Sequence, residues 1–425
     1  MTDLNRIQAP IFTEPDALVL PDVIKKTLQN GIPVFIVNGG AQPVFRIEVG
    51  FDVGNISHAN PLVAPITMQM LKQGTSKLSS HALNESIDFY GSFVESEAGR
   101  DFSGIAIYGI HRYAAESIQL LADMVYDAIF DEHEFNLMIQ NEKQKLKVAL
   151  EKVSFLANQA FFHELYDGKA YGRKVELSDF DTLTLSEVKK HYIHSIQQAK
   201  PTLFLSGQID DQILALIEHH FAPRNFVDFE SEKPTFSMVN GEIKNPFRID
   251  KKDAIQSAIR IGRRMFTRNH PDYMKMKVLN TVLGGYFGSR LMANIREEKG
   301  YTYGIGSAVQ SFLHDGFFYI ATEVGKDVLN DALNEVYKEI EVLQQTLIDA
   351  DELKVIKNYM IGSLLKDFDG PFEQLDCFKT VYRSGLTLAF YNQYVETIKR
   401  VTAEELQTLA QKYLNKNQLI EVSVG

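Results

Sequence analysis

The stretches "LTLSEVKKHYIHSIQQAKPTLFLSG" (183–207) and "VTAEELQTLAQKYLNKNQLIEVSVG" (401–425) decide the organisation of this chain, because they repeat one another. Three pairs of residues match at one constant offset: Thr184 with Thr402, Glu187 with Glu405, and Gly207 with Gly425. In each stretch, a Thr followed three residues later by a Glu predicts a capping box at the start of a helix. A short apolar, β-rich run then ends at Gly, which predicts a strand. The two stretches therefore indicate two equivalent halves.

Earlier segments of the two halves also correspond. Residues 31–40 and 43–55 predict successive strands joined by a Gly-containing turn, and residues 254–267 occupy the place of the second strand in the other half. Residues 112–130 and 329–348 carry apolar side chains at three- and four-residue spacing, which predicts long helices. Each half is thus predicted to run strand, strand, helix, strand, helices, strand. The predicted fold class is α+β, with two homologous domains that each contain a β-sheet packed with helices.

The two halves are separated by a segment of different composition. Residues 224–246 lose the apolar periodicity and collect charge, Pro and Gly. This pattern predicts an N-terminal domain over 1–222, a linker over 223–245 and a C-terminal domain over 246–425.

Composition excludes several classes of function. The 425 residues are 45% hydrophobic and 23% charged, which is typical of a globular protein, and the net charge of -11 argues against nucleic acid as a partner. The single cysteine, Cys377, excludes an intramolecular disulfide and is expected to be a small buried side chain. No window is apolar enough to span a membrane, and no signal peptide is visible at the N-terminus. We therefore expect a cytoplasmic protein.

The densest candidate for a functional site is "LGGYFGSRLMANIREEKGYTYGIGS", residues 283–307. Three of its glycines could be mistaken for part of a nucleotide-binding loop: Gly284, Gly285 and Gly288. Their spacing is not that of a phosphate loop, and no Lys-Ser or Lys-Thr pair follows. The segment instead predicts a glycine-rich turn that enters a helix, a break at Gly300 and a strand that begins near Tyr301.

This segment resembles the second-domain signature of the insulinase/pitrilysin zinc peptidases, which is close to S-R-L-x-x-x-L-R-E-x-x-G-x-x-Y. The matching residues are Ser289, Arg290, Leu291, Arg296, Glu297, Gly300 and Tyr303. The resemblance extends over nearly the whole chain, through the two equivalent halves, the Tyr-Gly-Arg segment at 171–173 and the repeated closing helix and strand. It implies two domains of the mitochondrial-processing-peptidase type.

The resemblance also implies a role for two of these residues. In the family, the Arg and Tyr hold the carbonyl of the substrate and stabilise the oxyanion, which here points to Arg296 and Tyr303. An arginine is always charged and carries a rigid fork of donors, and a tyrosine adds a neutral donor. The alternative is that Arg296 pairs with a surface acid and that Tyr303 only fills a half-buried strand position.

The metal motif of the family, H-x-x-E-H before a Gly-Thr pair, is degenerate in this chain. Aligned on the Gly-Thr pair at 74–75, the three motif positions hold Pro65, Met68 and Gln69. Pro and Met do not ligate zinc usefully, and a single Gln oxygen is a poor ligand. The third ligand of the family falls near Glu142, which alone cannot hold the ion. We therefore expect this chain to bind no metal itself.

Two other groups of residues have side chains of the types that ligate metals. His163, Glu164 and Asp167 resemble the start of a metal motif, but its second histidine is replaced by the aspartate. Three further residues share one predicted helical face: Glu187, His191 and His194. Since the equivalent helix of the second half has Leu409 and Lys412 at the two histidine positions, a repeated scaffold helix is the preferred interpretation.

Some members of the family work as two different chains, one with the zinc motif and one without it. The resemblance therefore implies a non-metallated subunit of a heterodimeric zinc endopeptidase that supplies Arg296 and Tyr303 to an active site completed by a zinc-bearing partner. The substrate would be an unfolded peptide, held partly by strand addition to a sheet edge. In isolation, the chain is also compatible with a homodimer. The alternatives are an inactive scaffold or interaction protein with the same fold, and a lone enzyme with an unrelated metal or none.

Overall fold

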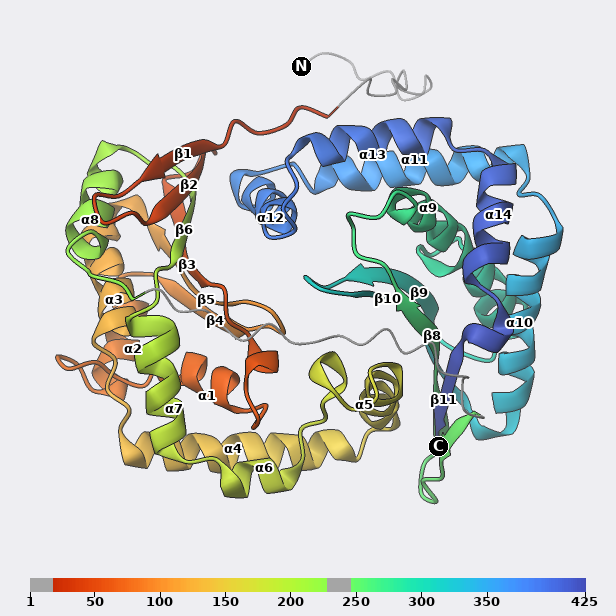
Figure 1. The fold of residues 1–425 in the computed structure, drawn as a ribbon, viewed down its shortest axis with the longest axis horizontal. Helices are drawn as coiled ribbons and strands as arrows, with labels where there is room; N and C mark the ends of the chain where they lie inside the picture. Colours follow the sequence, from red (N-terminus) through yellow and green to blue (C-terminus); the bar gives the residue numbers. More distant parts are fainter. Residues whose placement is uncertain (1–17, 228–245) are drawn as a thin grey trace, which may run out of the picture.

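The computed structural model describes residues 18–227 and 246–425, which form two sheet-and-helix halves (Figure 1). The first half contains a six-stranded sheet with the order β1-β2-β6-β3-β5-β4. Its strands are β1 (Ile24–Thr27), β2 (Pro33–Asn38), β3 (Val44–Phe51), β4 (Phe93–Ala98), β5 (Ser103–Ile110) and β6 (Thr202–Gly207). Strand β6 pairs parallel to β2 and antiparallel to β3, so the last strand of the half lies at the centre of its sheet.

The second half contains a five-stranded sheet with the order β7-β11-β8-β10-β9. Its strands are β7 (Phe247–Ile249), β8 (Gln256–Met265), β9 (Ile305–Ser311), β10 (Gly316–Gly325) and β11 (Ile420–Val424). Strand β11 pairs parallel to β7 and antiparallel to β8. It therefore occupies the same place as β6 in the first sheet, and this shared topology confirms that the repeated stretches are structurally equivalent.

Helices cover both sheets, and each half has a large apolar core of its own. The helices of the first half are α1 (Val63–Met70), α2 (Ser80–Phe89), α3 (Ala114–Tyr126), α4 (Glu132–Leu150), α5 (Val153–Leu165), α6 (Leu177–Thr182), α7 (Leu185–Tyr192) and α8 (Asp211–Phe221). Those of the second half are α9 (Tyr273–Gly284), α10 (Leu329–Gln345), α11 (Ala350–Lys366), α12 (Pro371–Tyr382), α13 (Ala389–Arg400) and α14 (Ala403–Tyr413). The predicted α+β class is confirmed. None of the helices among the described residues is long and apolar enough to cross a membrane.

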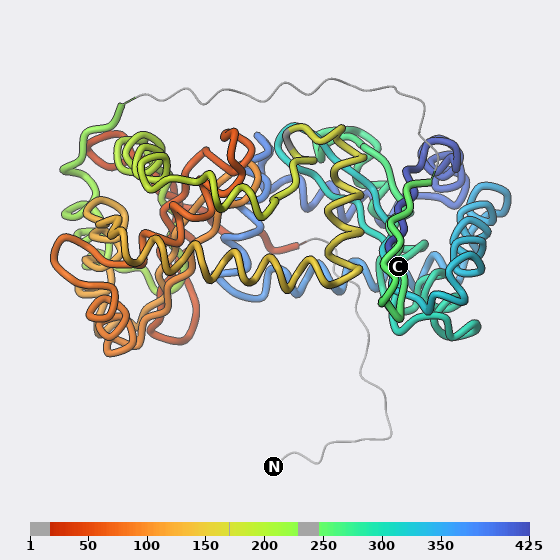
Figure 2. The backbone as a smooth tube through the Cα atoms, turned by 90° about the horizontal axis from the view of Figure 1, so that it is seen from below, coloured from red at the N-terminus to blue at the C-terminus, as the bar shows by residue number. Residues whose placement is uncertain are grey.

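The two halves exchange one helix each. Helix α5 of the first half packs on β8 and β11 of the second sheet, and Figure 2 shows it in yellow against the green strands. Helix α12 of the second half packs in return on β2 and β6 of the first sheet, where Leu375 is fully buried against Phe35 and Phe204. Each sheet is thus closed by a helix from the other half.

The repeated stretches form the predicted local structures. Thr184 and Thr402 each cap a helix, α7 and α14, in a complete capping box with the glutamate three residues later. The closing glycines allow a close approach between strands. A Cβ on Gly207, whose φ is +101°, would lie 2.3 Å from the carbonyl oxygen of Val44, and one on Gly425 would lie 2.2 Å from Oγ of Ser257. The two glycines are therefore required for packing.

Some expectations for the elements are corrected. Each half has a hairpin, β4–β5 or β9–β10, where a single strand was predicted. The strand predicted to begin near Tyr301 begins at Ile305 instead, because Oγ1 of Thr302 accepts a hydrogen bond from the N–H of Gly304 and holds a turn. Most of the linker predicted over 223–245 lies outside the described residues, and the domain boundaries stay predictions.

Candidate functional site

Helix α1 carries the degenerate metal motif and packs on β4, β5 and α7. Pro65 fits in its first turn because the amide groups there have no partner within the helix. Met68, at the position of the glutamate in the motif, is 1% exposed and belongs to the apolar core. The helix is followed by Gly74, whose φ of +116° allows the turn that carries the Gly-Thr pair.

The residues around α1 do not fit a zinc ion. Pro65 and Gln69 are partly exposed, but neither offers the imidazole nitrogen that zinc sites use. Glu142 lies on α4 and forms an ion pair with Lys145, with Oε1 2.7 Å from Nζ. Within residues 18–227 and 246–425, no group of three or more His, Cys, Asp or Glu side chains is placed to hold a metal ion.

Arg296 lies in a short π-helix, Met292–Glu298, that leads from the glycine-rich turn towards β9. Its guanidinium lies 4.5 Å from the centre of the Phe287 ring, and Nη1 lies 3.7 Å from Oε1 of Glu297. The side chain is one-third exposed. Since an aromatic ring supports the guanidinium but accepts few of its hydrogen bonds, most of its donors remain available.

Tyr303 follows in the turn between the π-helix and β9. It is 96% exposed, which contradicts the alternative of a half-buried strand residue. It lines a cavity of about 370 Å³ together with Arg260 and Glu323 of the second sheet. No hydrogen bond joins Tyr303 to Arg296 in the described parts of the chain, so the two side chains form separate donors at either end of one short segment.

The glycine-rich turn has a packing role. A Cβ on Gly284 would lie 2.6 Å from Oγ of Ser307, and one on Gly285 would lie 2.7 Å from Cα of Thr281. A Cβ on Gly288 would lie 2.8 Å from the ring of Tyr286. The absence of a side chain at Gly284 lets the end of α9 approach β9 closely, and the other two contacts lie within the helix end and the turn. This agrees with a turn and gives no support to a phosphate loop.

The structure does not bring the other candidate ligands together. The carboxylate of Glu187 caps α7, and Nδ1 of His194 lies 2.8 Å from the carbonyl oxygen of Lys190. His191 is buried, and its ring packs edge-on against His58 with the ring centres 4.3 Å apart. Burial and the neighbouring His58 lower the pKa of His191 to about 3. The three side chains therefore serve the packing of this helix.

Two further candidates are also explained by structure. His163 lies near the end of α5, and Asp167 has a positive φ of 51° in the turn that follows it. Burial raises the pKa of the Cys377 thiol to about 11, and Sγ donates a hydrogen bond to the carbonyl oxygen of Asp367. A thiol that stays protonated near neutral pH is a poor nucleophile.

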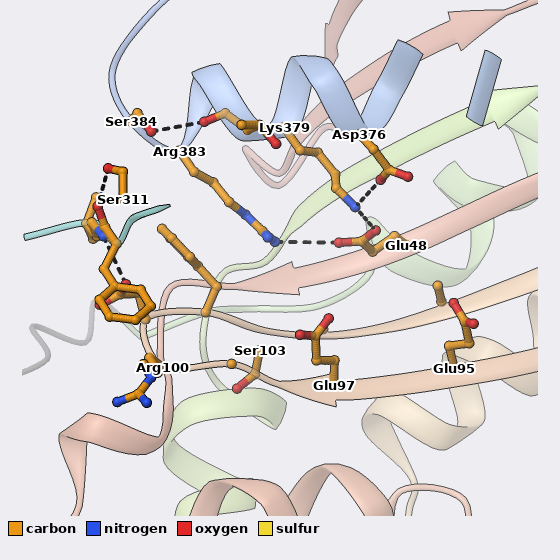
Figure 3. Close-up of a pocket in the computed structure, with 18 of the residues that line it drawn as sticks. Glu48, Glu95, Glu97, Arg100, Ser103, Ser311, Asp376, Lys379, Arg383 and Ser384 are labelled. Carbon is orange, nitrogen blue, oxygen red and sulfur yellow. Dashed lines mark hydrogen bonds and ion pairs between the residues drawn. The ribbon is translucent and has the colours of Figure 1, made fainter. Parts of the chain in front are cut away.

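A cluster of charges between the two halves was not predicted from the sequence. Strand β3 contributes Arg46 and Glu48, α12 contributes Asp376 and Lys379, and Arg383 follows at the end of α12. Figure 3 shows Glu48 facing Lys379 and Arg383. Nη2 of Arg46 lies 2.8 Å from Oε2 of Glu48, which also pairs with Lys379. The available signal was the pair of charges two positions apart in an otherwise apolar strand, which places both on one sheet face.

Comparisons with known proteins agree with this architecture. Residues 182–360 match the family model of the peptidase M16 inactive domain. The chain is 24% identical over 357 residues to the uncharacterized zinc protease YmxG of Bacillus subtilis, with 80% of this chain and 83% of that protein covered. It is 23% identical over 407 residues to the non-peptidase homolog YmxG of Helicobacter pylori, with 92% and 91% covered.

Solved structures share the fold. A protease from Helicobacter pylori has a TM-score of 0.87 at 17% identity, with 95% of this chain and 99% of that chain covered. A peptidase M16 inactive domain from Pseudomonas fluorescens has a TM-score of 0.83 at 19% identity, with 95% and 98% covered. A chain of complex III from Candida albicans has a TM-score of 0.76 at 17% identity, with 95% and 96% covered.

The fold of this chain is shared with solved structures described as a peptidase M16 inactive domain and as a protease. At its metal-motif positions this chain has Pro65, Met68 and Gln69 in place of ligands. The chain is accordingly similar to the M16 zinc proteases, the insulinase/pitrilysin family, and its relatives include proteins named both as zinc proteases and as non-peptidase homologs.

Proposed function

We propose that this chain is the non-metallated, substrate-binding subunit of a two-chain zinc endopeptidase. The observation that carries the proposal is the combination of a metal motif without ligands at Pro65, Met68 and Gln69 with an intact Arg296 and Tyr303. A protein that served only as a scaffold would have no use for that pair of donors. The zinc would be held by the partner chain.

The exposure of the two donors supports this role. Tyr303 projects into solvent, and the guanidinium of Arg296 packs on Phe287. Among the described residues, most of the N–H donors of Arg296 have no acceptor. A partner that covered this surface would exclude water from both side chains. In such a desolvated site, a cationic and a neutral donor stabilise the negative charge that develops on the carbonyl oxygen of a peptide.

The free edge of the first sheet supports a peptide substrate. Among the described strands, β4 pairs only with β5, so one of its edges is open. An extended peptide that adds to this edge would run beside α1, the helix that holds the motif positions in this half. Main-chain hydrogen bonds would hold the peptide, and alternate side chains would face opposite sides of the sheet.

Two measurements test the proposal. Metal analysis by mass spectrometry on the purified chain is expected to find no stoichiometric zinc, and one zinc per chain would contradict the proposed division of labour. A cleavage assay with unfolded peptides is then run with this chain, with an M16 chain that has an intact H-x-x-E-H motif, and with both. Cleavage is expected only, or far faster, with both chains. Equal rates with and without this chain would rule out the subunit role.

A scaffold is the second candidate function. It is favoured by the similarity of the fold to a chain of the complex III assembly of Candida albicans. In that case Arg296 and Tyr303 would contribute to packing or solubility only. The two candidates differ in whether substitution of these residues changes peptide cleavage by the combined chains.

A further inference from the structure

A cavity of about 410 Å³ lies between the two halves and is lined in part by the charge cluster of β3 and α12. Strands β3, β4 and β5 form its floor, the C-terminal part of α12 forms one wall, and residues 311–313 of the β9–β10 hairpin form another (Figure 3). It shares no residue with α1 or with the segment of Arg296 and Tyr303. A ligand in this cavity would contact both halves at once.

Small residues keep the floor open. On β5, Gly104 and Ala106 line the cavity beside Glu48. A Cβ on Gly104 would lie 3.5 Å from Oε1 of Glu48, so any larger side chain would grow into the space. The volume falls within the range of small-molecule sites, which combine a concave shape with a few well-placed polar groups.

The charges that line the cavity fall into two groups. Most of them are fully engaged: Lys379 pairs with Glu48 and Asp376, and Nη1 of Arg46 lies within 3.0 Å of both carboxylate oxygens of Asp376. Two are not. Arg383 has a single ion pair among the described residues, with Nη2 3.5 Å from Oε1 of Glu48, and Glu97 has no ion pair or hydrogen bond there.

The two available charges have opposite sign and come from different sides. Arg383 extends from α12, with its guanidinium 4.6 Å from the centre of the Phe102 ring, while Glu97 points from β4 towards α12 (Figure 3). The next acid along β4, Glu95, accepts a hydrogen bond from the hydroxyl of Tyr108 and has a second oxygen free. The cavity therefore has a cationic wall and an anionic edge.

The cationic side also has buried donors without acceptors. Arg46 is only 7% exposed, it lines the cavity, and its Nε–H has no partner among the described residues. Arg268 also lines the cavity, and its Nε–H likewise has no partner among the described residues. Both donors are buried within the wall of the cavity, so they add positive charge to this side without contacting a ligand directly.

We propose that this cavity binds a short zwitterionic peptide, of two or three residues with free termini. Its carboxylate lies against Arg383, and its ammonium group lies against Glu97. The peptide links the two charged termini, so that one ligand contacts both α12 and β4. This site is separate from the proposed oxyanion donors, so it stands whether or not the chain is a peptidase subunit.

Calorimetric titration of the full chain with three probes tests the proposal. The probes are dialanine, N-acetyl-dialanine, which lacks the ammonium group, and dialanine amide, which lacks the carboxylate. Dialanine is expected to bind saturably, and each blocked probe to bind about tenfold more weakly or worse, which is the scale of one lost hydrogen bond to a charged group. Equal affinity for the three probes, or no binding of dialanine, would overturn the proposal.

Variants connect each terminus to its residue. Glu97→Gln is expected to weaken dialanine to the level of N-acetyl-dialanine, while N-acetyl-dialanine itself binds as before. Arg383→Gln is expected to do the same for the carboxylate and the amide probe. Glu85→Gln, which removes the same charge on the exposed surface of α2, is the matched control and should change nothing. Because Glu97 is exposed, its variant tests the site even where loss of Arg383 prevents folding. Unchanged dialanine binding by Glu97→Gln would refute the assignment.

Discussion

Arg46 on β3 and Asp376 on α12 are 330 positions apart in the chain and form an ion pair between its two halves, with Nη1 3.0 and 2.9 Å from the carboxylate oxygens. Glu48 and Lys379 extend this pair into a network in which the side chains of Arg46, Glu48 and Lys379 are each about nine-tenths buried. The network fixes the position of α12 on the first sheet. Removal of one partner from such a buried network strongly destabilises the fold, because it leaves an uncompensated buried charge.

Glu48→Gln is expected to lower the free energy of unfolding by about 3 kcal/mol, because Arg46 and Lys379 would then share one carboxylate, that of Asp376, and Arg383 would lose its ion pair. Urea denaturation of the full chain measures the change. The control is Lys145→Gln, which breaks the exposed pair with Glu142 and should cost less than about 1 kcal/mol. Similar small losses in both variants would show that the network contributes little.

Arg296→Ala and Tyr303→Phe are each expected to lower the turnover of the combined chains by more than about tenfold, the usual scale for the loss of one oxyanion donor. The thermal stability should stay nearly unchanged, since Tyr303 is exposed and Arg296 has only a weak contact with Glu297. Tyr301→Phe, two positions before Tyr303, is the control. Full activity of both test variants would favour the scaffold function.

His191 should make stability depend on pH. Burial and the nearby His58 lower its pKa from 6.5 to about 3. Between these two pH values, the unfolded chain binds a proton at this histidine and the folded protein does not. Stability is therefore complete above pH 6.5 and falls as the pH drops towards 3, by about 1.4 kcal/mol per pH unit for this group.

His191→Leu copies the residue at the equivalent position of the second half, Leu409, which is buried. The variant is expected to lose less stability than the wild type between neutral pH and about pH 5 in urea denaturation. His194→Gln, at the exposed histidine of the same segment, should keep the wild-type slope. An identical pH dependence in all three proteins would contradict the assignment to His191.

Gly207→Ala is expected to be strongly destabilising. A Cβ there would lie 2.3 Å from a backbone oxygen of β3, in addition to the cost of a positive φ. Gly300→Ala is the matched control, because its φ is also positive, at +66°, but no atom lies within 4 Å of the new Cβ. We expect a loss of about 1 kcal/mol for Gly300→Ala and several times more for Gly207→Ala, measured by thermal or urea unfolding. Equal losses would mean that backbone conformation alone matters.

Local signals in the sequence were sufficient for the parts of the fold that depend on neighbouring residues. The capping boxes at Thr184 and Thr402 form as predicted, because a side chain and an amide three residues apart need no tertiary contact to find each other. The assignment of Met68 and its neighbours to the metal-motif positions came from the family resemblance and stays a prediction. The start of β9 was not predicted correctly, since the turn at Thr302 depends on hydrogen bonds that apolar periodicity does not encode.

Contacts between segments far apart in the chain could not be predicted from the sequence. An amphipathic pattern shows that a helix buries one face, but it does not identify the surface that covers that face. The burial of Leu375 of α12 against Phe35 and Phe204 therefore had no signal in the chain. The same holds for the charge network, whose partners lie more than 300 positions apart.

The exchange of α5 and α12 makes the two halves mutually dependent. A polypeptide that ended after the first half would expose the aromatic surface around Phe35 and Phe204, and would leave Arg46 and Glu48 without their partners on α12. The second half alone would likewise uncover the strand surface beneath α5. Although the two halves repeat one pattern of elements, α5 and α12 interlock them, and we expect neither half to fold on its own.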